Sequence, residues 1–221
     1  MNGNAGASVV SLLALSSLLA LAPLLVVTVT SFAKVSVVLF LVRNALGIQQ
    51  TPPNIVLYSI AIVLSLYVMA PVVTDTYAVF NDANAKMSTI PEMKRVAEEA
   101  VQPVRRFLDR HATMDSRSFF IESAKKVWTE PARSDVGPND LSILVPSFLT
   151  SELKRAFEIG FLLYLPFVMI DFVVSAILMA LGMQMMSPTV VSTPFKLLLF
   201  VLADGWDRLI QGLIMSYAPG V

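Results

Sequence analysis

The charged residues of this chain are confined to its middle. Of its 32 Lys, Arg, Asp and Glu side chains, 25 fall between Asp75 and Glu158, and the other 137 residues carry only seven. An apolar N-terminal third and an apolar C-terminal third therefore flank a polar segment. Overall, 56% of the residues are apolar and 14% are charged, against about 25% charged in soluble domains. The pattern predicts an integral membrane protein with a water-exposed middle.

The composition excludes several classes of function. The formal net charge is zero, which argues against duplex binding by phosphate neutralisation, so no nucleic-acid partner is expected. The absence of cysteine excludes a disulfide scaffold, a thiolate metal site and a cysteine nucleophile. Phosphate-binding and nucleophile-elbow motifs are missing, and the single histidine, His111, is expected to be a solvated surface residue. The sequence predicts no enzyme, no cofactor and no metal.

The predicted fold class is all-α, with membrane-associated, kinked helical hairpins around a central amphipathic region. A span needs about 20 apolar residues, and the first run has 26 without a charge. A cleaved signal peptide is the alternative for that run, but no basic side chain precedes it. Pro23 is expected to kink this helix, whose pattern continues until Gly47. The four apolar segments are Ser8–Ala33, Ile55–Val73, Ile159–Leu181 and Leu197–Ala203.

We expect three regions in the chain. Residues 1–74 form an N-terminal apolar hairpin, 75–150 a charged helical middle, and 151–221 a C-terminal apolar hairpin. In the middle, apolar residues recur at helical spacing over 90–108 and 119–128, with a loop over 129–140. Basic residues beside the first short turn favour a cytoplasmic turn, which places the middle region in the periplasm.

Two sets of ionisable residues interrupt the C-terminal apolar segments. Asp171 lies at the centre of the third run, where its carboxylate must face protein or water. Lys196, Asp204 and Arg208 recur four or eight residues apart, so one helix would place them on one face. That strip either pairs with itself or pairs with neighbouring subunits. A small-molecule or ion transporter using the buried Asp171 is an alternative function.

The connection between the third and fourth segments is rich in methionine. Met183, Gln184, Met185 and Met186 lie between Gly182 and Pro188. Methionines fill irregular gaps in apolar interiors, which is one interpretation. The other is a flexible constriction, in which several copies of the loop meet around an axis and close a pore.

Ten short motifs are spread along the chain in this order: Ser31–Lys34, Leu41–Gly47, Pro52–Asn54, Tyr67–Pro71, Thr150–Leu153, Ala156–Phe161, Leu165–Phe167 with Ile170–Asp171, Ala180–Met183, Pro194–Lys196 and Asp204–Trp206. Together they resemble the SctR/FliP family, the R-type subunit of the type III secretion export gate, over nearly the whole chain. Features in Gly47–Gln50 and Tyr58–Ala70 are more similar to the injectisome branch than to the flagellar one.

The resemblance implies an all-helical protein of the bacterial inner membrane. Several copies, five in the family's architecture, would assemble with the smaller S-type and T-type subunits, next to the U-type switch and V-type export subunits. Unfolded secreted proteins would thread the central channel. The family's methionine gasket falls on the loop above, although Gln184 interrupts the commoner unbroken methionine run. The ionisable residues expected to pack subunits together are Glu158, Asp171, Lys196, Asp204 and Arg208.

Overall fold

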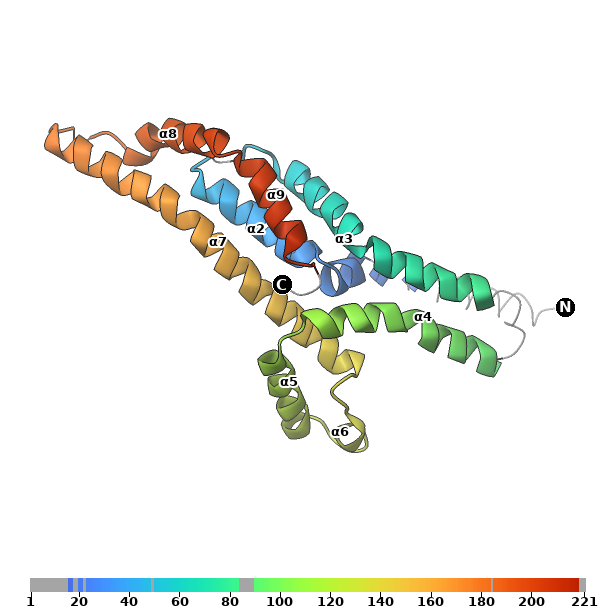
Figure 1. Ribbon diagram of the computed structural model, residues 1–221. Helices are drawn as coiled ribbons and strands as arrows, with labels where there is room; N and C mark the ends of the chain where they lie inside the picture. Colours follow the sequence, from blue (N-terminus) through green and yellow to red (C-terminus); the bar gives the residue numbers. More distant parts are fainter. Residues whose placement is uncertain are drawn as a thin grey trace.

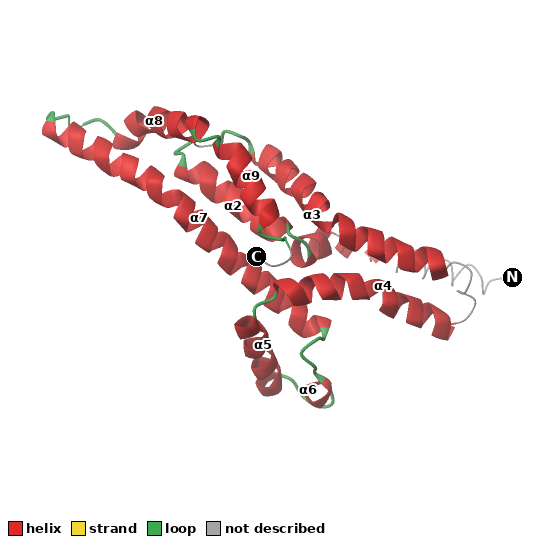
Figure 2. Cartoon of the chain, in the orientation of Figure 1, coloured by secondary structure: helices red, strands yellow, loops and turns green. Residues whose placement is uncertain are grey.

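The computed structural model describes residues 16–17, 20–21, 23–48, 50–83, 90–183 and 185–218, and these contain helices and no strand (Figures 1 and 2). The predicted all-α class is confirmed. After a helix over Pro23–Val29, the labelled elements are α2 (Phe32–Ala45), α3 (Asn54–Ala83), α4 (Ile90–His111), α5 (Met114–Val127), α6 (Ala132–Asp135), α7 (Leu141–Ala180), α8 (Pro188–Leu202) and α9 (Gly205–Met215).

The first apolar segment is bent sharply. The helix over Pro23–Val29 meets α2 at 80°, so this bend lies at Thr30 and Ser31; the residue before Pro23, where a kink was also expected, lies outside the described residues. The hydroxyl of Thr30 donates to the carbonyl of Val26 at 2.5 Å and accepts from the N–H of Phe32 at 3.3 Å. A side chain that competes with backbone groups in this way interrupts a helix. α2 then ends as predicted, before Gly47 at a φ of +73°.

Helix α3 is longer than the apolar run that predicted it. It continues past Pro71 for another twelve residues to Ala83. Its C-terminal half lies beside α4 (Figure 1), and Arg106 of α4 pairs with Asp75 of α3 at 3.4 Å. This packing against α4 compensates for the hydrogen bond that the proline cannot donate. Neither α3 nor α7 has a break at the expected boundaries near residues 74 and 150.

Helix α7 runs along the length of the molecule (Figure 1). It has 40 residues, or about 60 Å at 1.5 Å per residue, and begins 18 residues before the predicted apolar run. Its N-terminal half packs against α4 and α5, and α2 lies along it. The buried core follows α2, from Val35 to Leu46, and continues into a second cluster around Phe107 and Phe148.

Helices α2 and α7 pack tightly at Gly160. A Cβ added there would overlap the Leu41 side chain, with the Leu41 Cβ 3.1 Å away. We expect Gly160→Ala to lower the free energy of unfolding, because overpacking costs about 1–3 kcal/mol and outweighs about 1 kcal/mol of helix propensity. Gly212→Ala is the matched control, since nothing lies within 4 Å of its added Cβ. Unfolding measured in detergent should show a lower free energy of unfolding for Gly160→Ala and a higher one for Gly212→Ala. Equal changes in the two variants would contradict this packing.

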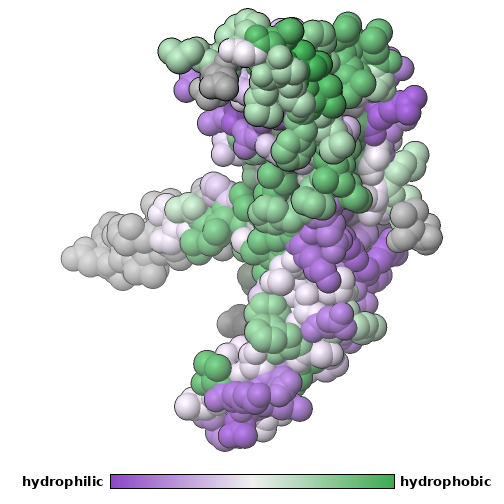
Figure 3. Space-filling view, turned by 90° about the vertical axis from the view of Figure 1, so that its left-hand side faces the viewer, coloured by the Kyte–Doolittle hydropathy of each residue, from purple (hydrophilic) through white to green (hydrophobic). Residues whose placement is uncertain are grey.

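Large apolar faces remain exposed. In the described residues, Asn54–Asn81 and Leu141–Ala180 are long and apolar enough to span a membrane, and the bent pair at the N-terminus would make a third span. Helix α8 is apolar but has only 15 residues, about 22 Å against a hydrocarbon core near 30 Å. Apolar residues cover the upper part of the face in Figure 3 and hydrophilic ones gather at its lower end. Surfaces of this kind are covered by lipid or by partner proteins.

Candidate functional site

The methionine loop forms the tip of the α7–α8 hairpin (Figure 1). Gly182 has a φ of +71°, and its N–H donates to the carbonyl of Met179 at 3.1 Å while the N–H of Met183 donates to Leu178 at 2.9 Å. These two bonds are a Schellman motif, which ends a helix at a left-handed glycine. Pro188 then starts α8 in its first turn. The chain therefore reverses at a defined place, and the loop projects from both helices.

The methionine side chains of this loop point away from the core. The exposed fractions are 41% for Met183, 101% for Met185 and 43% for Met186. They therefore fill no gap in the interior of this chain. Gln184, the remaining residue of the predicted gasket, lies outside the described residues.

The structure brings Asp171 and Lys196 together. The Nζ of Lys196 lies 2.6 Å from Oδ2 of Asp171, and the hydroxyl of Ser192 donates to Oδ1 at 2.5 Å. The ammonium group also donates to the carbonyl of Ala45 at 3.1 Å. The pair thus joins α7, α8 and the end of α2. The Asp171 carboxylate is balanced within the chain, as a carboxylate in an apolar segment must be.

The remaining predicted residues are not part of that pair. Helix α8 ends at Leu202, and Asp204 lies in a left-handed turn at a φ of +51° before α9. Lys196 and Arg208 are therefore on different helices, and the strip expected on one face is broken. Among the described residues Asp204 and Arg208 form no side-chain ion pair, and neither does Glu158, which is exposed on α7. These three groups are available to partners outside the chain.

Sequence reasoning missed a second buried ionic cluster. Lys34 and Glu152 are both fully buried, with Nζ 3.3 Å from Oε2. Arg155 pairs with the other carboxylate oxygen at 3.2 Å, and the Tyr217 hydroxyl also donates to Glu152. The Lys34 ammonium lies 3.5 Å from the centre of the Tyr217 ring. A lone Lys34 in an apolar run carried the same signal as Asp171, namely an ionisable group that requires a buried partner.

His111 belongs to this cluster, and the expectation of a solvated histidine was wrong. Its side chain is 6% exposed, and its ring centre lies 4.8 Å from that of Phe107 and 5.0 Å from that of Tyr217. Its backbone carbonyl accepts from Arg155 at 3.1 Å. The last turn of α4 is covered by α7 and the C-terminal turn, which the local sequence did not reveal.

We expect His111 to make stability depend on pH. Burial, followed by the charges of Lys34 and Arg155, lowers its pKa from 6.5 to about 4. As the pH falls, the unfolded chain therefore binds a proton on His111 at a higher pH than the folded chain does. The free energy of unfolding consequently decreases between about pH 6.5 and about pH 4, by about 3 kcal/mol in all. Thermal unfolding over this range tests the effect. His111→Phe, which keeps an aromatic ring, should remove this slope; an unchanged slope in the variant would contradict the assignment.

No group of three or more His, Cys, Asp or Glu side chains in the described part of the chain could hold a metal ion. The site instead combines buried ion pairs, exposed apolar helices and an exposed methionine turn. These features define a helical, membrane-associated protein built to pack against partners.

Comparison with known proteins identifies the family. The chain matches the FliP family over residues 15–213 and belongs to it. It is 52% identical to the probable translocation protein y4yL of Sinorhizobium fredii over 96% of both chains. It is 49% identical to the Yop proteins translocation protein R of Yersinia pestis, over 94% of this chain and 96% of that one. It is 42% identical to the virulence protein YscR of Salmonella typhimurium, over 96% of this chain and 98% of that one.

Proposed function

We propose that this chain is a pore-forming subunit of a type III secretion export gate in the bacterial inner membrane. Membership of the FliP family and relatives named as translocation and virulence proteins support a secretion component. The observation that carries the finer proposal is the methionine loop, which projects from the end of a long hairpin with its methionines exposed. Unfolded substrate proteins would cross the membrane through the channel that these loops close at rest.

The loop has the chemistry of a seal that can open. Thioether side chains are flexible and polarizable, so they adapt to irregular neighbours. A ring of apolar side chains in a narrow pore excludes water and ions by dewetting. Five copies around an axis would bring Met183, Met185 and Met186 of neighbouring chains into contact, and a passing unfolded chain would displace them.

The assembly that this requires agrees with the surfaces of the chain. Helices α3, α7 and α8 expose apolar faces that need partners or lipid. We assign those partners as further copies of this chain, the S-type and T-type subunits, and then the U-type and V-type subunits. The exposed Glu158 and Asp204 supply charges for contacts between subunits. The charged region 75–150 would face the periplasm.

Single-cysteine cross-linking tests whether the loops meet. The chain has no cysteine, so Met185→Cys introduces one thiol, at a residue 101% exposed. Under mild oxidation we expect Met185→Cys to form disulfide-linked dimers of this chain in the membrane. The matched control is Met114→Cys, at the start of α5 and 73% exposed, which should remain monomeric on a denaturing gel. If Met185→Cys forms no more dimer than this control, the loops do not meet around an axis.

A further inference from the structure

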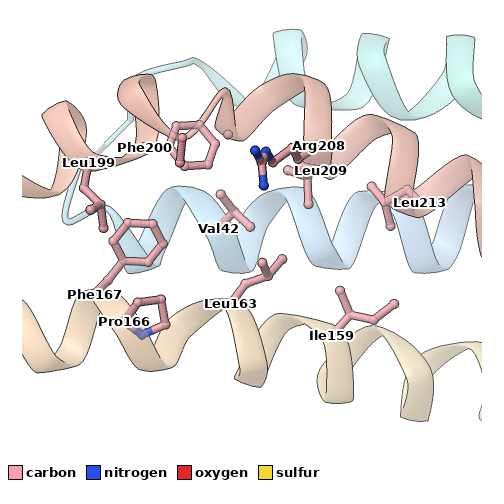
Figure 4. A pocket seen from close by; sticks show the side chains of 13 residues that line it. Val42, Ile159, Leu163, Pro166, Phe167, Leu199, Phe200, Arg208, Leu209 and Leu213 are labelled. Carbon is pink, nitrogen blue, oxygen red and sulfur yellow. The ribbon is translucent and has the colours of Figure 1, made fainter.

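An apolar cavity opens between α2, α7, α8 and α9 (Figure 4). Its volume is about 380 Å³. Val42 closes one side from α2, Leu163 and Phe167 come from α7, and Phe200 comes from α8. The break between α8 and α9 leaves this space, and Gly212 lines it with no side chain, since nothing lies within 4 Å of the Cβ position.

One charged side chain lines this cavity. The guanidinium group of Arg208 extends from α9 toward Val42 (Figure 4), and it has no ion pair or side-chain hydrogen bond in the described part of the chain. The nearest acidic residues in sequence, Asp204 and Asp207, do not line the cavity. The cavity therefore combines apolar walls with a single positive charge that forms no ion pair among the described residues.

We propose that this cavity binds an acyl chain of an anionic phospholipid whose phosphate contacts Arg208. An apolar pocket favours a hydrocarbon chain, and a guanidinium binds phosphate through two parallel hydrogen bonds. Basic pockets between membrane helices bind anionic lipid headgroups in this way. A zwitterionic lipid fits the walls equally well but brings a second, repelling cation to Arg208. The lipid site goes beyond the gate function and does not depend on it.

Native mass spectrometry of the full chain tests this site. The protein is reconstituted in nanodiscs of equal phosphatidylglycerol and phosphatidylcholine with identical acyl chains, and the retained lipids are counted. We expect phosphatidylglycerol to be enriched roughly fivefold, the factor for about 1 kcal/mol per basic residue. Arg208→Gln should remove the preference, and Gly212→Leu, which fills the cavity, should reduce retention of both lipids. Lys94→Gln changes a 79% exposed lysine on α4 and should leave the lipid preference and the number of retained lipids unchanged.

Equal retention of the two lipids by the unmodified protein would overturn the proposal, and so would a preference that persists in Arg208→Gln. If a second copy covers the cavity instead, no lipid is retained, and Arg208→Gln lowers the number of subunits. The same spectra report subunit number independently of lipid, so a failure of the gate assembly is distinguishable from a failure of this site.

Discussion

Reversing the charge of Lys196 is expected to abolish assembly of this protein. Its ammonium group pairs with Asp171 at 2.6 Å and donates to the carbonyl of Ala45, and its side chain is 4% exposed. Glutamate there would oppose a carboxylate and a carbonyl where little water can enter. Breaking a fully buried pair costs about 3–5 kcal/mol; because the Asp171 side chain is 33% exposed, the loss should lie at or below the lower end of that range, which is still a large part of a stability of about 5–15 kcal/mol. Helix α8 would then separate from α2 and α7.

Blue native gels of membrane extracts measure this effect. The Lys196→Glu variant should be missing from the assembled complex and more sensitive to protease. Lys94→Glu is the control, because that lysine is 79% exposed and its pair with Glu98 spans 3.9 Å, so assembly should persist. Adding Asp171→Lys to Lys196→Glu should restore part of the assembly, since the ion pair returns but the bond to Ala45 does not. Normal assembly of Lys196→Glu would refute the role of this pair.

Replacing Met183, Met185 and Met186 together with alanine is expected to make the resting membrane leak. Alanine has too small a side chain to fill the axis of a ring, so water would enter the constriction and ions would follow. The fold should be unaffected, because these side chains are 41% to 101% exposed and belong to neither buried core cluster. Ion flux across vesicles containing the assembled complex measures the leak.

A matched triple variant separates the loop from methionine content. Met93, Met114 and Met215 are also exposed, by 57%, 73% and 62%, but lie on α4, α5 and α9. Their replacement with alanine should leave the flux at the level of the unmodified protein. If the loop variant also stays at that level, the methionines do not seal a channel.

The sequence allowed the helical elements to be predicted where a local signal existed. The amphipathic periodicity of α4, the stop at Gly47 and the turn between Gly182 and Pro188 were all readable. The ends of the long helices were not, because α3 passes through Pro71, and α7 begins at Leu141 and passes through Pro146 and the charged residues 152–158. Packing against α4 and α5 supports those extensions, and single-sequence patterns do not contain that information.

For the ionic clusters, the sequence indicated some of the charged residues but not their contacts. Asp171 and Lys196 each stood out as a charge in an apolar run, but 25 residues separate them, and only the reversal at Gly182 places them together. The contact between Lys34 and Glu152 spans most of the chain. Asp204 was assigned to a continuous helix because its spacing from Lys196 and Arg208 fits one, whereas its left-handed conformation breaks the helix there.

The native mass of the detergent-extracted protein tests the gate proposal most directly. The protein should be expressed with and without its genomic neighbours and weighed as an intact complex. We expect a discrete assembly of several 24.1 kDa chains, which gains small membrane subunits when the neighbours are present. A stable monomer or dimer under both conditions would contradict the account, because no ring of methionine loops could then form.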